Sequence, residues 1–219
     1  RYGGKWFLQS RNQPGVKEKN REEIGAELGL DANKKTAVIF SPVLWDANLF
    51  YGEDLFEDFG NWFVQTVKAA CGNPTVNWIV KLHPANAWKR ARENVVSELA
   101  EIKLIRENIG DLPMHVKLLY PTTDISTFSL FKLSDYGLTV RGTVGMELPC
   151  FGVPVFTAGT GRYSGLGFTN DSQTKEEYLK KIARIQEFGK LSTEETLLAK
   201  RHAYGIFALR PWIMKSFKA

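Results

Sequence analysis

Residues able to bind a phosphate follow a short apolar run that ends at Leu82. The run carries Lys81 near its end, and His83 and Pro84 come directly after it. An ammonium or imidazole group at such a place can hold a phosphate through charge or a charge-assisted hydrogen bond. A histidine that only satisfies its own surroundings is the alternative. We predict that His83 is catalytic and that Lys81 contacts a nucleotide.

A second candidate site is the segment RGTVGME (141–147), which follows another apolar run. Its glycines would let the backbone approach a ligand closely, and the start of the next helix would offer N–H groups to a phosphate. Glu147 could accept hydrogen bonds from ribose hydroxyls. A tight turn between a strand and a helix is the alternative, since neither the Walker A nor the GxGxxG pattern is present. The predicted nucleotide contacts here are Arg141, Gly142, Thr143, Gly145 and Glu147.

Three other loops carry candidate ligand contacts. In YPTTD (120–124), backbone groups of Tyr120, Pro121 and Thr122 could pair with a nucleobase; otherwise this is a plain loop in which Asp124 caps a helix. A glycine-rich loop, 158–167, is predicted to cover a ligand. Contacts with the sugar or the acceptor are predicted for Asp46, Asn48, Arg162 and Tyr163. The alternative for Asp46 and Asn48 is that they only shape the turn after the first strand.

Short apolar runs alternate with amphipathic segments along the chain, and this pattern predicts the elements that position these residues. Strands are expected at 36–43, 77–82, 116–120, 136–140 and 153–157. Helices are expected at 17–30, 54–71, 91–108, 126–133, 145–151, 175–188 and 193–208, the last capped by Ser192. The alternation indicates an α/β fold, a Rossmann-like parallel sheet with helices on both faces. Ligands bind such sheets at the carboxyl ends of the strands, where the topology switches direction.

The composition is that of a folded globular protein of 219 residues, with 43% hydrophobic and 24% charged residues. The net charge of +5 suits phosphorylated ligands and is too small to predict a nucleic-acid binder. Cys71 and Cys150 stand far apart without a CxxC pattern, which favours a reducing compartment over disulfides or a zinc site. No apolar run is long enough to span a membrane, and no signal peptide is evident. We expect a cytoplasmic protein, with association at the inner face of a membrane left open.

The chain is expected to hold one domain. Residues 1–16 have no periodicity and are interpreted as a lead-in or linker. Residues 17–219 are interpreted as a Rossmann-like donor-nucleotide-binding domain with C-terminal closing helices. The start at Arg1, without an initiator methionine, indicates a processed, trimmed or excised chain.

Four segments carry a resemblance to a known family: KLHP (81–84), YPTTD (120–124), 134–172 and TKEEYLKKI (174–182). They resemble the donor-binding half of a GT-B glycosyltransferase, and are similar to bacterial capsule polysaccharide biosynthesis proteins, which include β-Kdo transferases. In that family an HP motif and a Ser/Thr motif at a helix start hold the nucleotide phosphate. His83 with Pro84 matches the first motif, and Thr143 matches the second.

The resemblance implies a nucleotide-sugar donor, with CMP-Kdo as a candidate, and a polysaccharide or lipid-linked acceptor. It also implies a second Rossmann-like domain, which in many GT-B enzymes contributes the catalytic base. No DxD motif is present, so neither a metal nor another cofactor is implied. Two alternatives stay open: transfer of a polyol phosphate from a CDP-glycerol-type donor, and a non-catalytic binding or scaffold domain.

Overall fold

The computed structural model describes residues 16–44, 54–85 and 98–209. Their centre is a six-stranded sheet in the order β3-β2-β1-β4-β5-β6, and every adjacent pair is parallel. This confirms the predicted Rossmann-like sheet and adds a short sixth strand. The strands are β1 (Thr36–Phe40), β2 (Asn77–Lys81), β3 (Val116–Leu119), β4 (Tyr136–Thr139), β5 (Val155–Thr157) and β6 (Asn170–Asp171).

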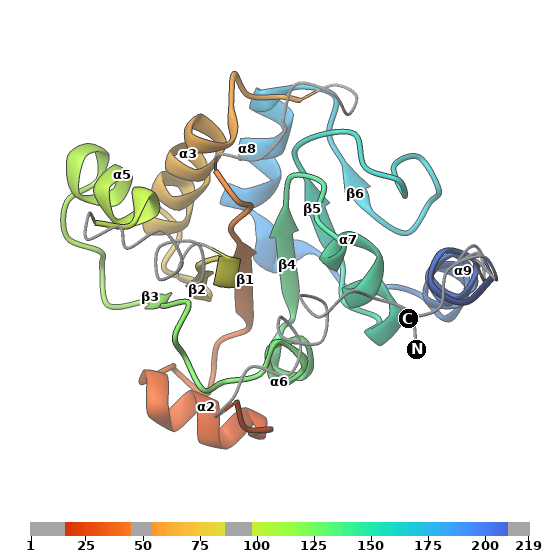
Figure 1. Cartoon of the computed structure of the whole chain (residues 1–219), viewed down its shortest axis with the longest axis horizontal. Coiled ribbons are helices and arrows are strands. Elements are labelled where there is room, and N and C mark those ends of the chain that lie inside the picture. The colour runs from red at the N-terminus through yellow and green to blue at the C-terminus, as the bar shows by residue number, and fades with distance from the viewer. Residues whose placement is uncertain (1–15, 45–53, 86–97, 210–219) are drawn as a thin grey trace, which may run out of the picture.

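Helices cover both faces of the sheet because its central strands are apolar on both sides. Ile39 and Val80 pack on the face covered by α3 (Phe59–Cys71), α5 (Ala100–Asn108) and α8 (Lys175–Ala183). Val38 and Ile79 pack on the face covered by α2 (Arg21–Leu28), α6 (Thr127–Leu133) and η1 (Leu148–Phe151). The remaining helices are α7 (Val144–Glu147), η2 (Ile185–Glu187), α9 (Thr193–Tyr204) and η3 (Gly205–Leu209). Figure 1 shows α5 and α9 at opposite ends of the molecule.

Side-chain caps set the starts of several helices. Asn20 with Glu23, and Ser192 with Glu195, form capping boxes at α2 and α9, as expected for Ser192. Asp58 accepts a hydrogen bond from the Asn61 N–H and starts α3 five residues later than the predicted helix over 54–71. The residues before α3 instead run beside the segment after β5, where the Leu55 N–H donates to the Ala158 carbonyl.

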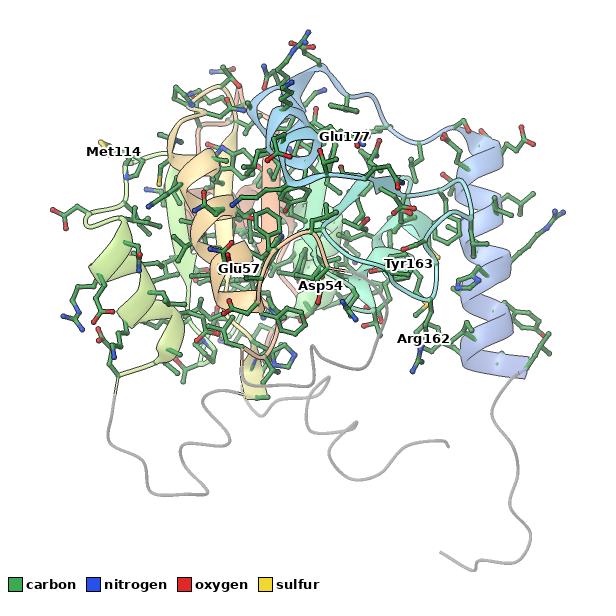
Figure 2. The ribbon with its side chains drawn as sticks, turned by 90° about the horizontal axis from the view of Figure 1, so that it is seen from above. Asp54, Glu57, Met114, Arg162, Tyr163 and Glu177 are labelled. Carbon is green, nitrogen blue, oxygen red and sulfur yellow. The ribbon has the colours of Figure 1, made fainter. Side chains whose placement is uncertain are left out.

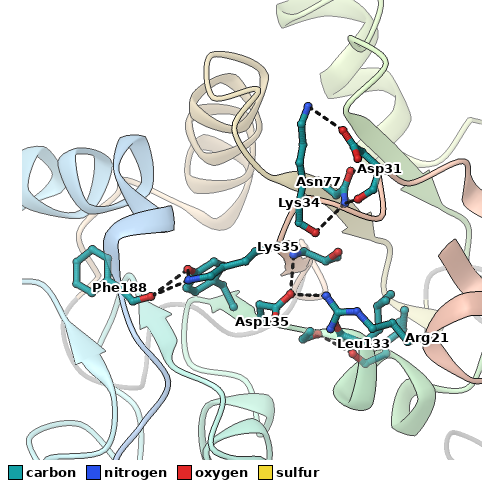
Figure 3. A network of polar contacts seen from close by, with 12 residues as sticks. Arg21, Asp31, Lys34, Lys35, Asn77, Leu133, Asp135 and Phe188 are labelled. Carbon is teal, nitrogen blue, oxygen red and sulfur yellow. Dashed lines mark hydrogen bonds and ion pairs between the residues drawn. The ribbon is translucent and has the colours of Figure 1, made fainter.

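The amino edge of the sheet is closed by polar contacts within the protein (Figure 3). Asp135, just before β4, accepts hydrogen bonds from the Thr36 N–H and from the Arg21 guanidinium. Lys35, just before β1, donates to the Tyr136 hydroxyl at 2.8 Å. Because these polar groups already bond one another, this edge offers a ligand little to replace.

Two kinds of feature are absent from the described parts of the chain. No helix there is long and apolar enough to cross a membrane. No group of three His, Cys, Asp or Glu side chains there is arranged to hold a metal ion.

Candidate functional site

The candidate site lies at the carboxyl edge of the sheet, where the chain order changes direction between β1 and β4. These two strands are neighbours, with Val38 beside Gly137 and Ile39 beside Leu138. β2 and β3 extend the sheet on one side of β1. β4, β5 and β6 extend it on the other side. In open α/β sheets this switch point is where ligands bind. The segments that follow β1, β2, β3 and β4 all reach this one edge because the strands are parallel.

The end of β2 brings a buried lysine to this edge. Lys81 is 7% exposed and lies in register between Phe40 of β1 and Leu119 of β3. Burial disfavours the charged ammonium, and it lowers the pKa of Lys81 from 10.5 to about 8. Lysine is rarely buried this deeply unless it has a partner or a function, so Lys81 becomes a stronger site candidate than its position in the sequence alone suggested.

His83 follows two residues later at the start of a helix that begins with Pro84. The His83 Nδ1 accepts a hydrogen bond of 3.1 Å from the Ala85 N–H, so the ring acts as an N-terminal cap. Proline at the first helical position is favoured because its missing N–H would have no partner there. The HP pair therefore holds the imidazole in one orientation at the exit from β2, and the ring is partly exposed.

The loop after β3 is held by the segment that precedes α2. Tyr120 is 50% exposed, Pro121 is buried and Thr122 is exposed. Asp124 does not cap α6, which Ser126 caps instead; it pairs with the Lys19 ammonium at 2.7 Å. This ion pair lowers the pKa of the Asp124 carboxyl below its usual value, chiefly through the hydrogen bond from Lys19. The predicted nucleobase loop is therefore braced from outside the site.

The loop after β4 places Arg141, Gly142 and Thr143 together at the switch point. The Arg141 guanidinium forms a largely buried ion pair with Asp54, which sequence reasoning missed. Thr143 is exposed and is the N-cap residue of α7, and its hydroxyl donates to Glu147 at 3.3 Å. Thr143 and Glu147, each predicted to contact the nucleotide, thus lie side by side, while the charge of Arg141 is balanced within the protein.

Several N–H groups of this loop are already bonded within it. The Gly145 N–H donates to the Gly142 carbonyl, and those of Met146 and Glu147 donate to the Thr143 carbonyl. The Gly142 N–H donates to the Thr139 hydroxyl at 3.2 Å. A phosphate at this loop would therefore meet the Thr143 side chain before it met an open row of amides.

Tyr163 lies in the core beneath this loop, and it explains two of the glycines. It is 1% exposed, and its hydroxyl donates to the Gly142 carbonyl at 2.9 Å. A Cβ on Gly145 would overlap the Tyr163 ring, and one on Gly161 would come within 2.8 Å of it. The sequence predicts that Gly145 admits a ligand and that Tyr163 contacts one. In the structure the Tyr163 ring instead occupies the space beside Gly145. Burial raises the pKa of the Tyr163 hydroxyl.

Arg162 differs from its neighbour, because it is exposed and points away from the core while Tyr163 turns inward (Figure 2). The loop that carries both is tied down by Asp171. Its carboxylate accepts hydrogen bonds from the Thr157 and Thr169 hydroxyls and from the Gly165 N–H, at 2.7 to 2.8 Å. The glycine-rich segment is thus an anchored part of the fold.

The predicted contacts Asp46 and Asn48 lie outside the described residues.

One further polar side chain at the carboxyl edge was not foreseen. Glu101 of α5 is fully buried, and its carboxylate accepts a hydrogen bond of 3.4 Å from the Ser41 hydroxyl after β1. Glu101 lies within the helix predicted over 91–108, where the residue types around it do not distinguish it from the other acidic residues of that segment. The open hollow of about 500 Å³ elsewhere in the molecule, between η1 and α9, contains none of the predicted site residues.

Comparison with known proteins identifies the fold. No protein-family model matches the sequence, and a search of curated proteins finds no match. Among solved structures, a UDP-GlcNAc 2-epimerase from Neisseria meningitidis bound to UDP-GlcNAc matches with a TM-score of 0.52 and 15% identity, over 81% of this chain and 42% of that one. A protein assigned as a UDP-N-acetylglucosamine 2-epimerase from Listeria monocytogenes matches with a TM-score of 0.50 and 16% identity, over 88% and 49%.

A beta Kdo 2,7 transferase from Thermosulfurimonas dismutans also matches, with a TM-score of 0.46 and 16% identity over 82% of this chain and 50% of that one. At that similarity the match does not distinguish one enzyme of this fold from another. The chain spans about half the length of these structures. It therefore has the fold of one Rossmann-like half of GT-B-type nucleotide-sugar enzymes.

Proposed function

We propose that the chain is the donor-binding half of a glycosyltransferase that takes its sugar from a nucleotide-sugar, with CMP-Kdo as the candidate donor. The acceptor would be a surface or capsular polysaccharide, or its lipid-linked precursor, handled at the cytoplasmic face of a membrane. The observation that carries this proposal is the buried ammonium of Lys81, two residues before His83, at the carboxyl edge of a GT-B-type sheet and one strand away from its switch point. A buried cation at that place suits a ligand whose phosphates are negatively charged.

In the proposed site, the segments after different strands contact different parts of the donor. The phosphates would lie against Lys81, His83 and Thr143. The ribose hydroxyls would donate to Glu147, and the base would pair with the backbone of 120–122. Arg162, exposed on the loop after β5, is the described residue that could reach the sugar or the acceptor. The catalytic base and much of the acceptor site would come from a second Rossmann-like domain.

In the proposed reaction, the donor-binding half stabilises the nucleotide as it leaves the sugar. When the glycosidic bond breaks, its electron pair goes to the phosphate oxygen, and negative charge grows there. Hydrogen-bond donors and cations fixed beforehand around that oxygen lower the barrier, because they bind the transition state more tightly than the donor itself. His83, whose ring is held by the Ala85 N–H, is the predicted donor for this charge. The proposed reaction draws on no metal.

Product analysis tests the reaction class. The enzyme containing this chain would be incubated with CMP-Kdo, UDP-GlcNAc and CDP-glycerol in the presence of capsular or lipid-linked acceptors. Release of CMP with extension of a glycan supports the proposal. Release of CMP from CDP-glycerol, with glycerol phosphate transferred, would replace it with polyol-phosphate transfer. A chain that binds no nucleotide at all would instead indicate a scaffold domain.

A further inference from the structure

Lys81 is a cation for which the protein supplies no counter-charge among its described residues. Burial is the one cause of its lowered pKa, and no hydrogen bond or ion pair of the Nζ is found within 16–44, 54–85 and 98–209. A buried ion without a partner is costly, and the cost is tolerated where a ligand or a reaction uses the charge. The missing counter-charge is thus a reason to look for an anionic ligand at this point.

The charged groups on the elements around Lys81 are engaged elsewhere. Asp124, in the loop after β3, pairs with Lys19. Arg141, which follows β4, pairs with Asp54, which precedes α3. Glu101 of α5 accepts a hydrogen bond from Ser41, and none of these groups contributes to the shifted pKa of Lys81. Among residues 16–44, 54–85 and 98–209, no opposite charge therefore acts strongly on this ammonium, and an anionic ligand would supply one.

His83 is arranged to donate a hydrogen bond as a neutral ring. Its Nδ1 accepts the Ala85 N–H at 3.1 Å, so in the neutral imidazole the proton is on Nε2. Protonating Nδ1 would replace this hydrogen bond with two N–H groups facing each other.

The extended chain keeps Lys81 and His83 on one side. The sheet hydrogen bonds continue past the strand, since the Ser41 N–H donates to the Lys81 carbonyl and the Leu82 N–H donates to the Leu119 carbonyl. Alternate side chains of an extended segment point the same way, so the residues two apart can reach one group. Leu82, between them, is fully buried on the opposite side.

We infer that Lys81 supplies the positive charge for the ligand's phosphate, and that His83 acts there as a neutral Nε2–H donor rather than as a cation. This inference rests on the proposed function, because it specifies how the nucleotide's phosphate is recognised. It predicts that affinity depends on the protonation of Lys81, so phosphate binding weakens in alkaline solution and not through the neutral range where histidine titrates.

The charge states can be measured before any nucleotide is added. ¹⁵N NMR of the imidazoles distinguishes the tautomers, and a His83→Gln spectrum assigns the signals among the three histidines. We expect a neutral His83 ring with a protonated Nε2 at pH 7. The ¹³Cε signal of Lys81, assigned with Lys81→Met, should titrate near pH 8. A charged His83 ring or an Nδ1–H tautomer at pH 7 would overturn the inference.

Proton linkage tests the same point with ligand. The binding of CDP-glycerol would be measured by calorimetry in buffers of different ionisation enthalpy. Each of its two phosphates carries one ester and one anhydride bond, so neither titrates near neutral pH. At pH 6.5 we expect almost no proton uptake, and at pH 8.5 uptake of more than about half a proton. Affinity should fall by up to about tenfold per pH unit above pH 8.

Variants separate the two side chains. Uptake at pH 8.5 should persist in His83→Gln and in the control Lys103→Met, an exposed lysine on α5, and should vanish in Lys81→Met. Uptake centred between pH 6 and 7 and lost in His83→Gln would contradict the assignment. If no nucleotide binds, the proposed function fails, and pyrophosphate becomes the probe. A Lys81 titration moved to higher pH by pyrophosphate supports the anion site, and an unmoved one overturns it.

Discussion

Replacing Lys81 with methionine should make the protein more stable at neutral pH, because it removes a buried charge and keeps much of the side-chain volume. The pKa of Lys81 falls from 10.5 in the unfolded chain to about 8 in the folded one. Between these values the unfolded state binds the extra proton, so the free energy of unfolding of the wild type rises as pH increases from 8 to 10.5. The full difference corresponds to about 3 kcal/mol.

The assay is urea denaturation of both proteins at pH 7 and pH 10. Lys81→Met should exceed the wild type by about 2 to 3 kcal/mol at pH 7, and this advantage should shrink as the wild-type lysine becomes neutral. The exposed control Lys103→Met should change stability by less than about 0.5 kcal/mol at either pH. A destabilised Lys81→Met at pH 7, or an advantage that does not change with pH, would refute the interpretation of Lys81 as an uncompensated buried cation.

Three further predictions concern the loops around the site. In the full-length enzyme, His83→Ala should lower kcat by roughly 10²-fold while weakening nucleotide binding much less, since its hydrogen bond strengthens as charge grows in the transition state; steady-state kinetics with an unchanged kcat would exclude this role. Glu147→Ala should mainly raise the KM for the donor, because ribose contacts do not change during the reaction; a large loss of kcat alone would argue against a ribose contact. Gly145→Ala should destabilise the fold by at least about 1 to 3 kcal/mol, because the added Cβ would overlap Tyr163. The control is Gly25→Ala in α2, where the added Cβ meets no neighbouring group within 4 Å. It should be neutral or stabilising by up to about 1 kcal/mol. Thermal denaturation of the two alanine variants compares them directly, and equal stabilities would mean that the Tyr163 contact is not tight.

The sheet was predictable because the sequence of each longer strand shows a local pattern typical of a buried strand. Runs such as TAVIF and NWIVK are short, apolar and bounded by turn residues, and alternation with amphipathic helices leaves few arrangements other than a parallel sheet. β6 was missed because Asn170–Asp171 has two residues and neither is apolar. The start of α3 was misplaced because the residues from Asp54 onward continue the helical spacing. In the folded chain the Leu55 N–H bonds to the Ala158 carbonyl, 103 positions later in the sequence, and Leu55 is therefore not helical.

The sequence was enough to predict that the candidate loops meet at one edge of the sheet. It was not enough to predict the contacts that their side chains make there. His83, Pro84 and Thr143 carry short motifs, and strand ends place them at one edge. Three facts needed the folded chain: the Arg141 pair with Asp54, the packing of Tyr163 into the space left by Gly145, and the burial of Glu101. Each depends on contacts between segments far apart in the sequence, which residue types and spacing do not encode.

The central claim is that a pyrimidine nucleotide binds at the carboxyl edge of the sheet, next to the switch point between β1 and β4. The most direct test is a ¹H–¹⁵N NMR titration of the chain with CMP, UMP, CDP, UDP and AMP, read at assigned amides. The account predicts that a pyrimidine nucleotide shifts the amides of residues 81–85 and 141–147 in a saturable way, with AMP weaker, while amides lining the hollow between η1 and α9 stay unchanged. Saturable shifts confined to that hollow, or no shifts with any pyrimidine nucleotide at millimolar concentration, would contradict it.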